Sequence, residues 1–90
     1  MSLTLLGGEL TLDAVEEGKV VRVLGFEGRG GWVYRMYQMG VVPGSTLEVL
    51  VNNGRGPVIL RVMGVEVAVG RGLARRIRVA VLGEGGKWPR

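Results

Sequence analysis

The sequence predicts a mostly β protein that folds as one small, partly open barrel of about five short strands, with one short α-helix inserted between the first and second strands. Ninety residues make a single domain, because a chain of this size buries only about 60% of its unfolded surface and cannot divide its core in two. The 17 glycines, the many valines and the few aromatic residues suit β-branched strands joined by tight turns. Apolar and polar residues alternate in most of five short segments, which is the period of a strand with one wet face.

The first eleven residues predict an N-terminal extension. Gly7 and Gly8 lie between two leucine-containing runs and can supply the positive φ angles of a two-residue turn, which favours a small hairpin. Thr11 is then a candidate N-cap for a short helical turn that places Leu12 and Val15 on one face and ends at Gly18. Residues 12–82 are expected to form the barrel domain.

The five predicted strands are separated by glycine-containing turns. "NNGRGP" and a lone Gly64 link three of the strands into an antiparallel meander, and "GRG" leads into a helical turn at Leu73–Arg76. Closing so few strands into a small barrel hides their edges, and we expect the SH3-like arrangement. The strands are predicted at Lys19–Leu24, Thr46–Asn52, Pro57–Met63, Val65–Val69 and Ile77–Leu82.

The stretch "WVYRMYQMG" predicts the inserted helix, Trp32–Met39. Its bulky side chains recur at helical spacing, and Gly40 stands where a left-handed C-terminal cap is wanted. We expect Val33, Met36 and Tyr37 to cover one open end of the barrel. Pro43 and Gly44 then occupy the second and third positions of a type II turn, so Gly40, Pro43 and Gly44 are predicted to be structural.

Charge is unevenly distributed along the chain, whose formal net charge is +4. Residues 1–19 hold four acidic residues and one lysine, whereas residues 71–90 hold six basic residues and one glutamate. A basic end attracts nucleic acid, anionic lipid or an acidic protein surface, and solvated surface arginines are the simpler interpretation. The glycine-rich residues 83–90, "GEGGKWPR", predict a flexible basic tail, and the N-terminal residues match neither a signal peptide nor a membrane span. We therefore expect a cytoplasmic protein.

The residue types of this chain argue against catalysis and against a tight metal site. Histidine and cysteine are both absent, which removes the common neutral-pH general base, the thiolate nucleophile and the two best ligands for transition metals. We expect no enzyme activity, no cofactor and no tight metal site. "GFEGRGG" opens the helix, but Trp32 and Val33 stand where a phosphate-binding loop needs Lys and Ser or Thr, so it is interpreted as a turn.

From Leu12 to Val79, about three quarters of the chain, the sequence resembles the ferrous iron transport protein A family, FeoA. The resemblance rests on "LDAVEEGKVVRVLG", "YRMYQMGVVPGSTLEVL" and "GPVILRVMGVEVAVGRGLARRIRV" in that order. Met36 stands where the family has Leu, and Val69, Gly70 and Arg71 stand where it has Leu-Arg. The residues that match the family's pattern are Gly18, Arg35, Gly40, Pro43, Gly44, Gly56, Pro57, Ala74, Ile77 and Val79.

The resemblance implies an SH3-like, non-enzymatic accessory protein that acts on the membrane iron transporter FeoB through that transporter's cytosolic GTP-binding region. Because aromatic residues and arginine are enriched at interface hot spots, the predicted partner-binding residues are Tyr34, Arg35, Tyr37 and Gln38, with Arg71 added.

Two alternatives remain open. The basic segment Arg71–Arg78 suggests a nucleic-acid-binding barrel. Under the favoured interpretation, contact with a transporter, we expect no nucleic acid as a partner. The chain also resembles the SH3-like regulatory module of iron-dependent repressors. Valine-rich strands with an open edge further suggest a homo-oligomer.

Overall fold

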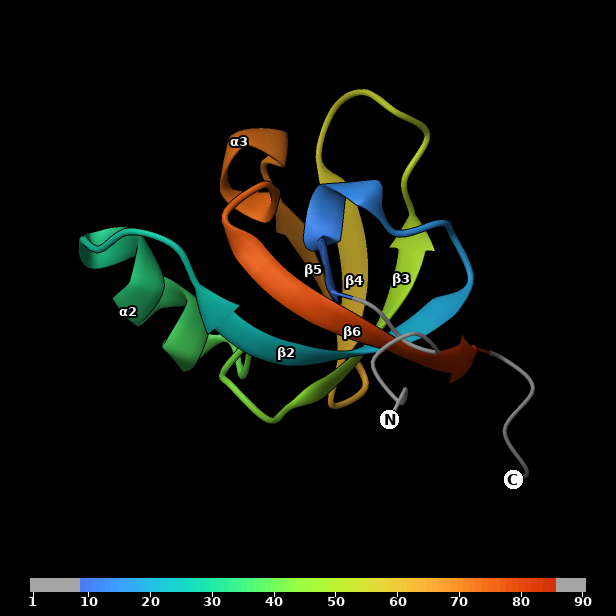
Figure 1. Ribbon diagram of the computed structural model, residues 1–90, viewed down its shortest axis with the longest axis horizontal. Coiled ribbons are helices and arrows are strands. Elements are labelled where there is room, and N and C mark those ends of the chain that lie inside the picture. The colour runs from blue at the N-terminus through green and yellow to red at the C-terminus, as the bar shows by residue number, and fades with distance from the viewer. Residues whose placement is uncertain (1–8, 86–90) are drawn as a thin grey trace.

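Six antiparallel strands form one curved sheet in the order β1-β6-β2-β3-β4-β5 (Figure 1). The structure is a computed structural model that describes residues 9–85. The strands are β1 Glu9–Thr11, β2 Lys19–Phe26, β3 Thr46–Val51, β4 Val58–Val62, β5 Val65–Val69 and β6 Ile77–Glu84. The helices are the 3-10 helix η1 Leu12–Ala14, and the α-helices α2 Gly31–Gln38 and α3 Arg71–Ala74. The mostly β prediction is confirmed.

The sheet curls into a partly open barrel because its longest strands are bent. β2 and β6 pair along eight residues each, with register shifts at Val20/Val21 and Val23/Gly25. Such bulges bend a strand and increase its twist. At Gly25, beside the second shift, an added Cβ would lie 2.9 Å from the Arg78 guanidinium, so a larger residue here would displace that flexible side chain. β1 and β5 remain the two edges of the sheet.

The core lies inside this curl and follows the alternation of the strands. β3 and β4 bury every second residue, such as Leu47 and Val49 on β3 and Leu60 on β4. Leu12 and Val15 of the first turn are buried on the same core, as the spacing predicts. The core therefore collects side chains from almost the whole described chain.

The N-terminal part of the fold differs from the five-strand prediction. Glu9–Thr11 forms a sixth strand, β1, which pairs with Arg78–Ala80 of β6. The first arm of the predicted hairpin, at residues 1–8, lies outside the described residues. At the other end β6 extends into the predicted tail, because Gly83 and Glu84 still pair with β2, and the remainder, residues 86–90, lies outside the described part.

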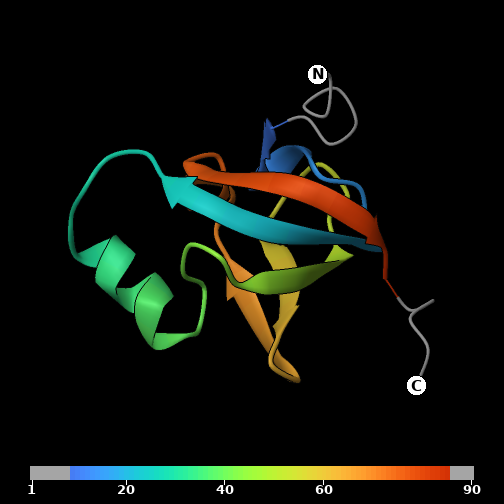
Figure 2. The same ribbon diagram turned by 60° about the horizontal axis from the view of Figure 1, so that its bottom comes forward.

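The helix α2 lies beside the barrel, beyond the end of β2 (Figures 1 and 2). Trp32 and Met36 are its buried residues, and Val33 packs partly against the core. Tyr37, which was expected to cover the barrel end together with Val33 and Met36, packs against Phe26 there and is 49% exposed. Trp32 takes that place since it lies one turn before Met36 and packs edge-on against Phe26 of β2.

Candidate partner-binding surface

Four solvent-exposed side chains lie on one face of α2. Tyr34 and Tyr37 are 67% and 49% exposed, and Arg35 and Gln38 are exposed beside them. Positions three and four apart are neighbours on a helix, so these residues share one side, opposite Trp32 and Met36. The structure thus brings together the four helix residues that the sequence selects.

The buried side of α2 fixes this face in space. The Trp32 indole Nε1–H donates a hydrogen bond of 3.2 Å to the carbonyl oxygen of Arg29. Its ring lies 5.5 Å from the Phe26 ring at an interplanar angle of 89°, and the Tyr37 ring lies 5.9 Å from the same Phe26. Edge-to-face aromatic pairs add about 0.5–1.5 kcal/mol beyond area burial. Tyr37 therefore packs against Phe26 on one side, while about half of its surface stays exposed to solvent.

The end of α2 is a Schellman cap centred on Gly40. The Gly40 N–H donates to Tyr37 O at 3.0 Å and the Val41 N–H to Met36 O at 2.9 Å, with Gly40 at φ +89°. A Cβ at Gly40 would also lie 3.1 Å from Val62 Cγ1. Gly40 therefore meets two demands, a left-handed backbone and close approach of the β4–β5 hairpin.

The Pro43–Gly44 turn attaches the corner to the sheet. The Ser45 N–H donates to Val42 O at 2.9 Å and Gly44 has φ +94°, the geometry of a type II turn. The Gly44 N–H then donates to Val23 O at 2.8 Å, and the Val23 N–H to Ser45 O at 2.9 Å. Two backbone bonds to β2 thus set where α2 lies relative to the barrel.

A hollow of about 470 Å³ adjoins the exposed face of α2 on the side of the preceding loop. Its lining consists of Val33, Tyr34 and Tyr37 from the helix and residues 28–30 from the loop. The exposed tyrosines therefore border a concave, largely apolar surface. A concave apolar surface of this kind can receive a side chain of a partner protein.

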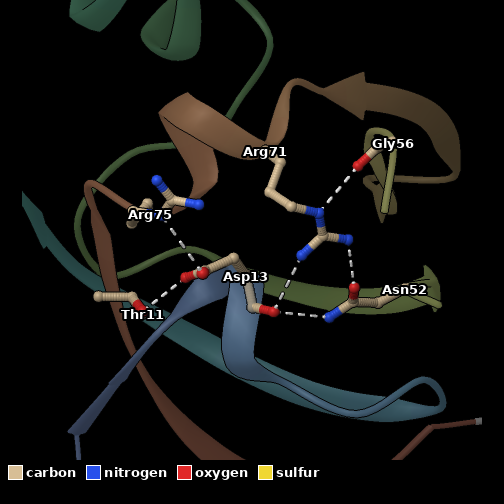
Figure 3. A network of polar contacts seen from close by, with 6 residues as sticks. All are labelled: Thr11, Asp13, Asn52, Gly56, Arg71 and Arg75. Carbon is tan, nitrogen blue, oxygen red and sulfur yellow. Dashed lines mark hydrogen bonds and ion pairs between the residues drawn. The ribbon is translucent and has the colours of Figure 1, made fainter. Parts of the chain in front are cut away.

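Arg71 lies in α3, and its guanidinium points toward Asn52, Gly56 and Asp13 (Figure 3). It donates to Asn52 Oδ1 at 2.6 Å, to Gly56 O at 3.1 Å and to Asp13 O at 3.4 Å. Asn52 in turn donates from Nδ2 to Asp13 O and Val15 O. Arg71 thus joins α3, the β3–β4 loop and η1, which gives it a structural role beside the predicted partner role.

The sequence and fold agree with one family of known proteins. The family model for the FeoA domain matches residues 10–81. A protein of Methanocaldococcus jannaschii named "Putative Fe(2+) transport protein A" is 39% identical over 72 residues, which cover 80% of this chain and 87% of that protein. The chain belongs to the FeoA domain family.

Solved structures support the assignment at the level of the fold. A crystal structure of an iron uptake regulatory protein, FeoA, superposes with a TM-score of 0.77 at 34% identity, covering 82% of this chain and 99% of that one. A manganese-dependent transcriptional repressor shares the fold with a TM-score of 0.72 at 22% identity, covering 84% of this chain and 43% of the repressor. FeoA domains are therefore similar in fold to a part of metal-dependent repressors.

In this FeoA domain most arginines of the basic segment are engaged within the chain. Arg75 Nε lies 3.8 Å from Asp13 Oδ2, and Arg78 lies 3.6 Å from both Glu9 and Glu27. Together with Arg71, three of the four arginines at 71–78 thus meet acidic or backbone oxygens of the described residues. They form no continuous row of free guanidinium groups, which weakens the case for phosphate contacts.

Within residues 9–85, no three acidic side chains come close enough together to hold a metal ion. None of the helices in that range is long and apolar enough to cross a membrane. The prediction of no tight ferrous site stays a prediction.

Two residues at functional positions were missed by the sequence reasoning. Asn52 was placed at the end of a predicted strand and given no role, yet it accepts a hydrogen bond from Arg71 and donates one to Val15 O. Met63 was placed at a strand end, whereas it forms the tip of the β4–β5 hairpin with φ +51° and is 87% exposed. A left-handed conformation costs a non-glycine residue roughly 1–2 kcal/mol. The two-residue Met63–Gly64 turn was the available signal, since such turns need positive φ at both positions.

Proposed function

We propose that this FeoA domain is a cytoplasmic, non-enzymatic accessory protein of ferrous iron uptake that acts by contact with the GTP-binding region of a FeoB-type transporter. The exposed face of α2, with Tyr34, Arg35, Tyr37 and Gln38, makes that contact. Family membership supports the iron-transport role, and the surface supports contact as its means.

The observation that carries the proposal is the contrast between the two sides of α2. Trp32 and Met36 fix one side in the core, while two tyrosines and one arginine remain exposed on the other. Two exposed tyrosines cost solubility, and Tyr and Arg are among the residue types that dominate interface energies. The absence of His and Cys supports the same conclusion, because the chain offers few ligands with which to carry iron itself.

A titration of the purified GTP-binding region into this protein tests the proposal. We expect saturable binding on the order of tens of micromolar or tighter, and a loss of about tenfold for Tyr34→Ala or Arg35→Ala, which is about 1.4 kcal/mol. Arg55→Ala is the matched control, because Arg55 is exposed in the β3–β4 loop, away from α2. Absence of saturable association, or equal losses for the control, would contradict the proposal.

A further inference from the structure

β5 leaves one edge of the sheet open, and its free backbone groups can be assigned. In a two-residue hairpin the residues flanking the turn form a hydrogen-bonded pair, here Val62 and Val65, and the pairs then alternate along the ladder. Glu66 and Ala68 therefore direct their N–H and C=O groups away from β4. No backbone bond outside the sheet ladder reaches either residue within the described chain.

The sequence of β5 protects this edge only weakly, by one charged residue, Glu66, on a strand of five residues. Its five residues, "VEVAV", contain no proline or lysine, and the register with β4 runs without a bulge. Natural proteins usually protect an open edge by one of these devices, because a free edge pairs with other chains. A weakly protected edge in a protein that works by contact is therefore a candidate for strand addition.

The open edge borders a groove that separates β5 from α2. Two adjoining hollows of about 490 and 370 Å³ share Gln38 and Met39 of the helix segment. Val65 and Val67 line the first hollow, and Ala68 and Val69 line the second. Figure 2 shows β5 facing the side of the molecule on which α2 lies. Together the hollows run along the whole of β5.

The lining of the groove contains one charged residue. Arg35 is the only charged residue that lines either hollow, and it makes no ion pair with any residue in the range 9–85. The other lining residues are apolar apart from glycines, Gln38 and Tyr37. An occupant that complements this lining is apolar and carries a carboxylate opposite Arg35.

Met63 lies at the mouth of the groove, at the tip of the hairpin that leads into β5. Its side chain is 87% exposed although its backbone is in a left-handed conformation, where Asn or Gly would be less strained. A flexible thioether is well suited to a surface that adapts to a partner's side chains. The strained turn thus presents an apolar group where an incoming segment would start.

We propose that an extended segment of a partner protein adds to β5 as a new strand and lies between β5 and α2, with alternate apolar side chains in the groove and a carboxylate on Arg35. The backbone groups of Glu66 and Ala68 supply the hydrogen bonds, and the groove supplies specificity, as in other cases of strand addition. The inference rests on the proposed function in that α2 faces a partner protein.

Selection from a phage-displayed library of random peptides, about seven residues long and so able to span β5, tests the inference without the transporter. We expect enriched peptides with alternating apolar residues and an Asp or Glu. In the complex the amide protons of Glu66 and Ala68 should exchange with solvent about tenfold more slowly, since they become hydrogen-bonded. A proline-rich consensus, apolar residues at helical spacing, or no enrichment would overturn the inference. The inference would also be overturned if the free protein formed a dimer that the Ala68→Pro substitution dissociates, because a second copy of the chain would then occupy the edge of β5.

Variants separate the backbone and charge contributions. Ala68→Pro removes the N–H that faces the groove and should weaken peptide binding by about tenfold or more. Should that variant fail to fold, Arg35→Glu tests the charge, and its binding should return when the peptide carboxylate is replaced by lysine. Met63→Asn should weaken binding while leaving the hairpin intact, and Arg55→Glu is the control for charge reversal and should bind as the wild type does.

The outcome is distinguishable from failure of the proposed function. Strand-like peptides that bind β5 without any binding of the GTP-binding region would contradict only the choice of partner. Binding of that region at equal strength by wild type and Ala68→Pro, together with the expected loss for Tyr34→Ala, would overturn the strand-addition inference and leave the proposed function standing.

Discussion

At the scale of single residues, Gly40 is held by two independent constraints. Its φ of +89° lies in the region that favours glycine, and an added Cβ would lie 3.1 Å from Val62 Cγ1 and 3.4 Å from Met63 Sδ. The first constraint belongs to the helix cap and the second to the contact between α2 and the β4–β5 hairpin. Gly40 therefore couples the position of the exposed helix face to the groove beside β5.

Gly40→Ala should lower the free energy of unfolding by about 1–3 kcal/mol, because it combines left-handed strain with a close contact. Gly72→Ala is the matched control, since Gly72 has an ordinary φ, no neighbour within 4 Å of an added Cβ and a place in α3. It should be neutral or stabilising by up to about 1 kcal/mol. Urea denaturation of the two variants measures both effects, and equal values would contradict the explanation.

At the scale of elements, the contacts of Arg71 hold three short segments that have little structure of their own. α3 and η1 are one turn each, and the β3–β4 loop has no regular structure, so none of them is stable in isolation. The Arg71 guanidinium donates hydrogen bonds to Asp13 O in η1 and to Gly56 O and Asn52 Oδ1 in the β3–β4 loop. The element scale is thus where this arginine has its effect, at the end of the barrel shown in Figure 3.

Arg71→Met should lower the free energy of unfolding by about 2–3 kcal/mol, because hydrogen bonds from a charged donor are lost and Asn52 Oδ1 keeps no guanidinium partner. Arg75→Met is the control, since Arg75 is exposed and only 3.8 Å from Asp13, and such a pair contributes at most about 1 kcal/mol. Thermal and urea unfolding compare the variants. A larger effect from Arg75→Met would contradict the structural role assigned to Arg71.

At the scale of the whole molecule, the two longest strands are joined where β2 begins and β6 ends. The Lys19 ammonium pairs with the Glu84 carboxylate, and the Gly85 N–H donates to Gly18 O. The hydrogen bond that the Lys19 ammonium donates to the Glu84 carboxylate, followed by the negative charge of Glu84, raises the pKa of Lys19 above the ordinary value of 10.5. This contact ties the C-terminal end of the described chain to the start of the barrel.

The raised pKa of Lys19 sets the direction of a pH effect. A group whose pKa is higher in the folded state stabilises the protein below the unfolded pKa, and this contribution is lost as the pH rises through the folded pKa. We therefore expect the wild type to lose more stability than Lys19→Gln as the pH rises from about 9 through the raised pKa of Lys19. Unfolding at a series of pH values measures the difference, and parallel curves would contradict the assignment.

The secondary structure was largely predictable because its causes are local. Val65–Val69 was predicted at the observed bounds, and the helix ends moved by only one residue, since periodicity and Gly40 mark them in the sequence. The type II turn at Pro43–Gly44 was predictable for the same reason, because its φ requirement selects glycine at a known position. Residue type selected Tyr34, Arg35, Tyr37 and Gln38, and all four are exposed, although helical spacing had also predicted that Tyr37 would cover the barrel end.

The sequence by itself determined the mostly β class, the inserted helix and the turns, because alternation, helical spacing and positive φ act over a few residues. Only the tertiary structure decided that Trp32 instead of Tyr37 enters the core, that β1 pairs with β6, and that Arg71 joins three segments. It also decided that the open edge of β5 borders α2. These features depend on contacts between residues far apart in the chain, and no local pattern specifies them.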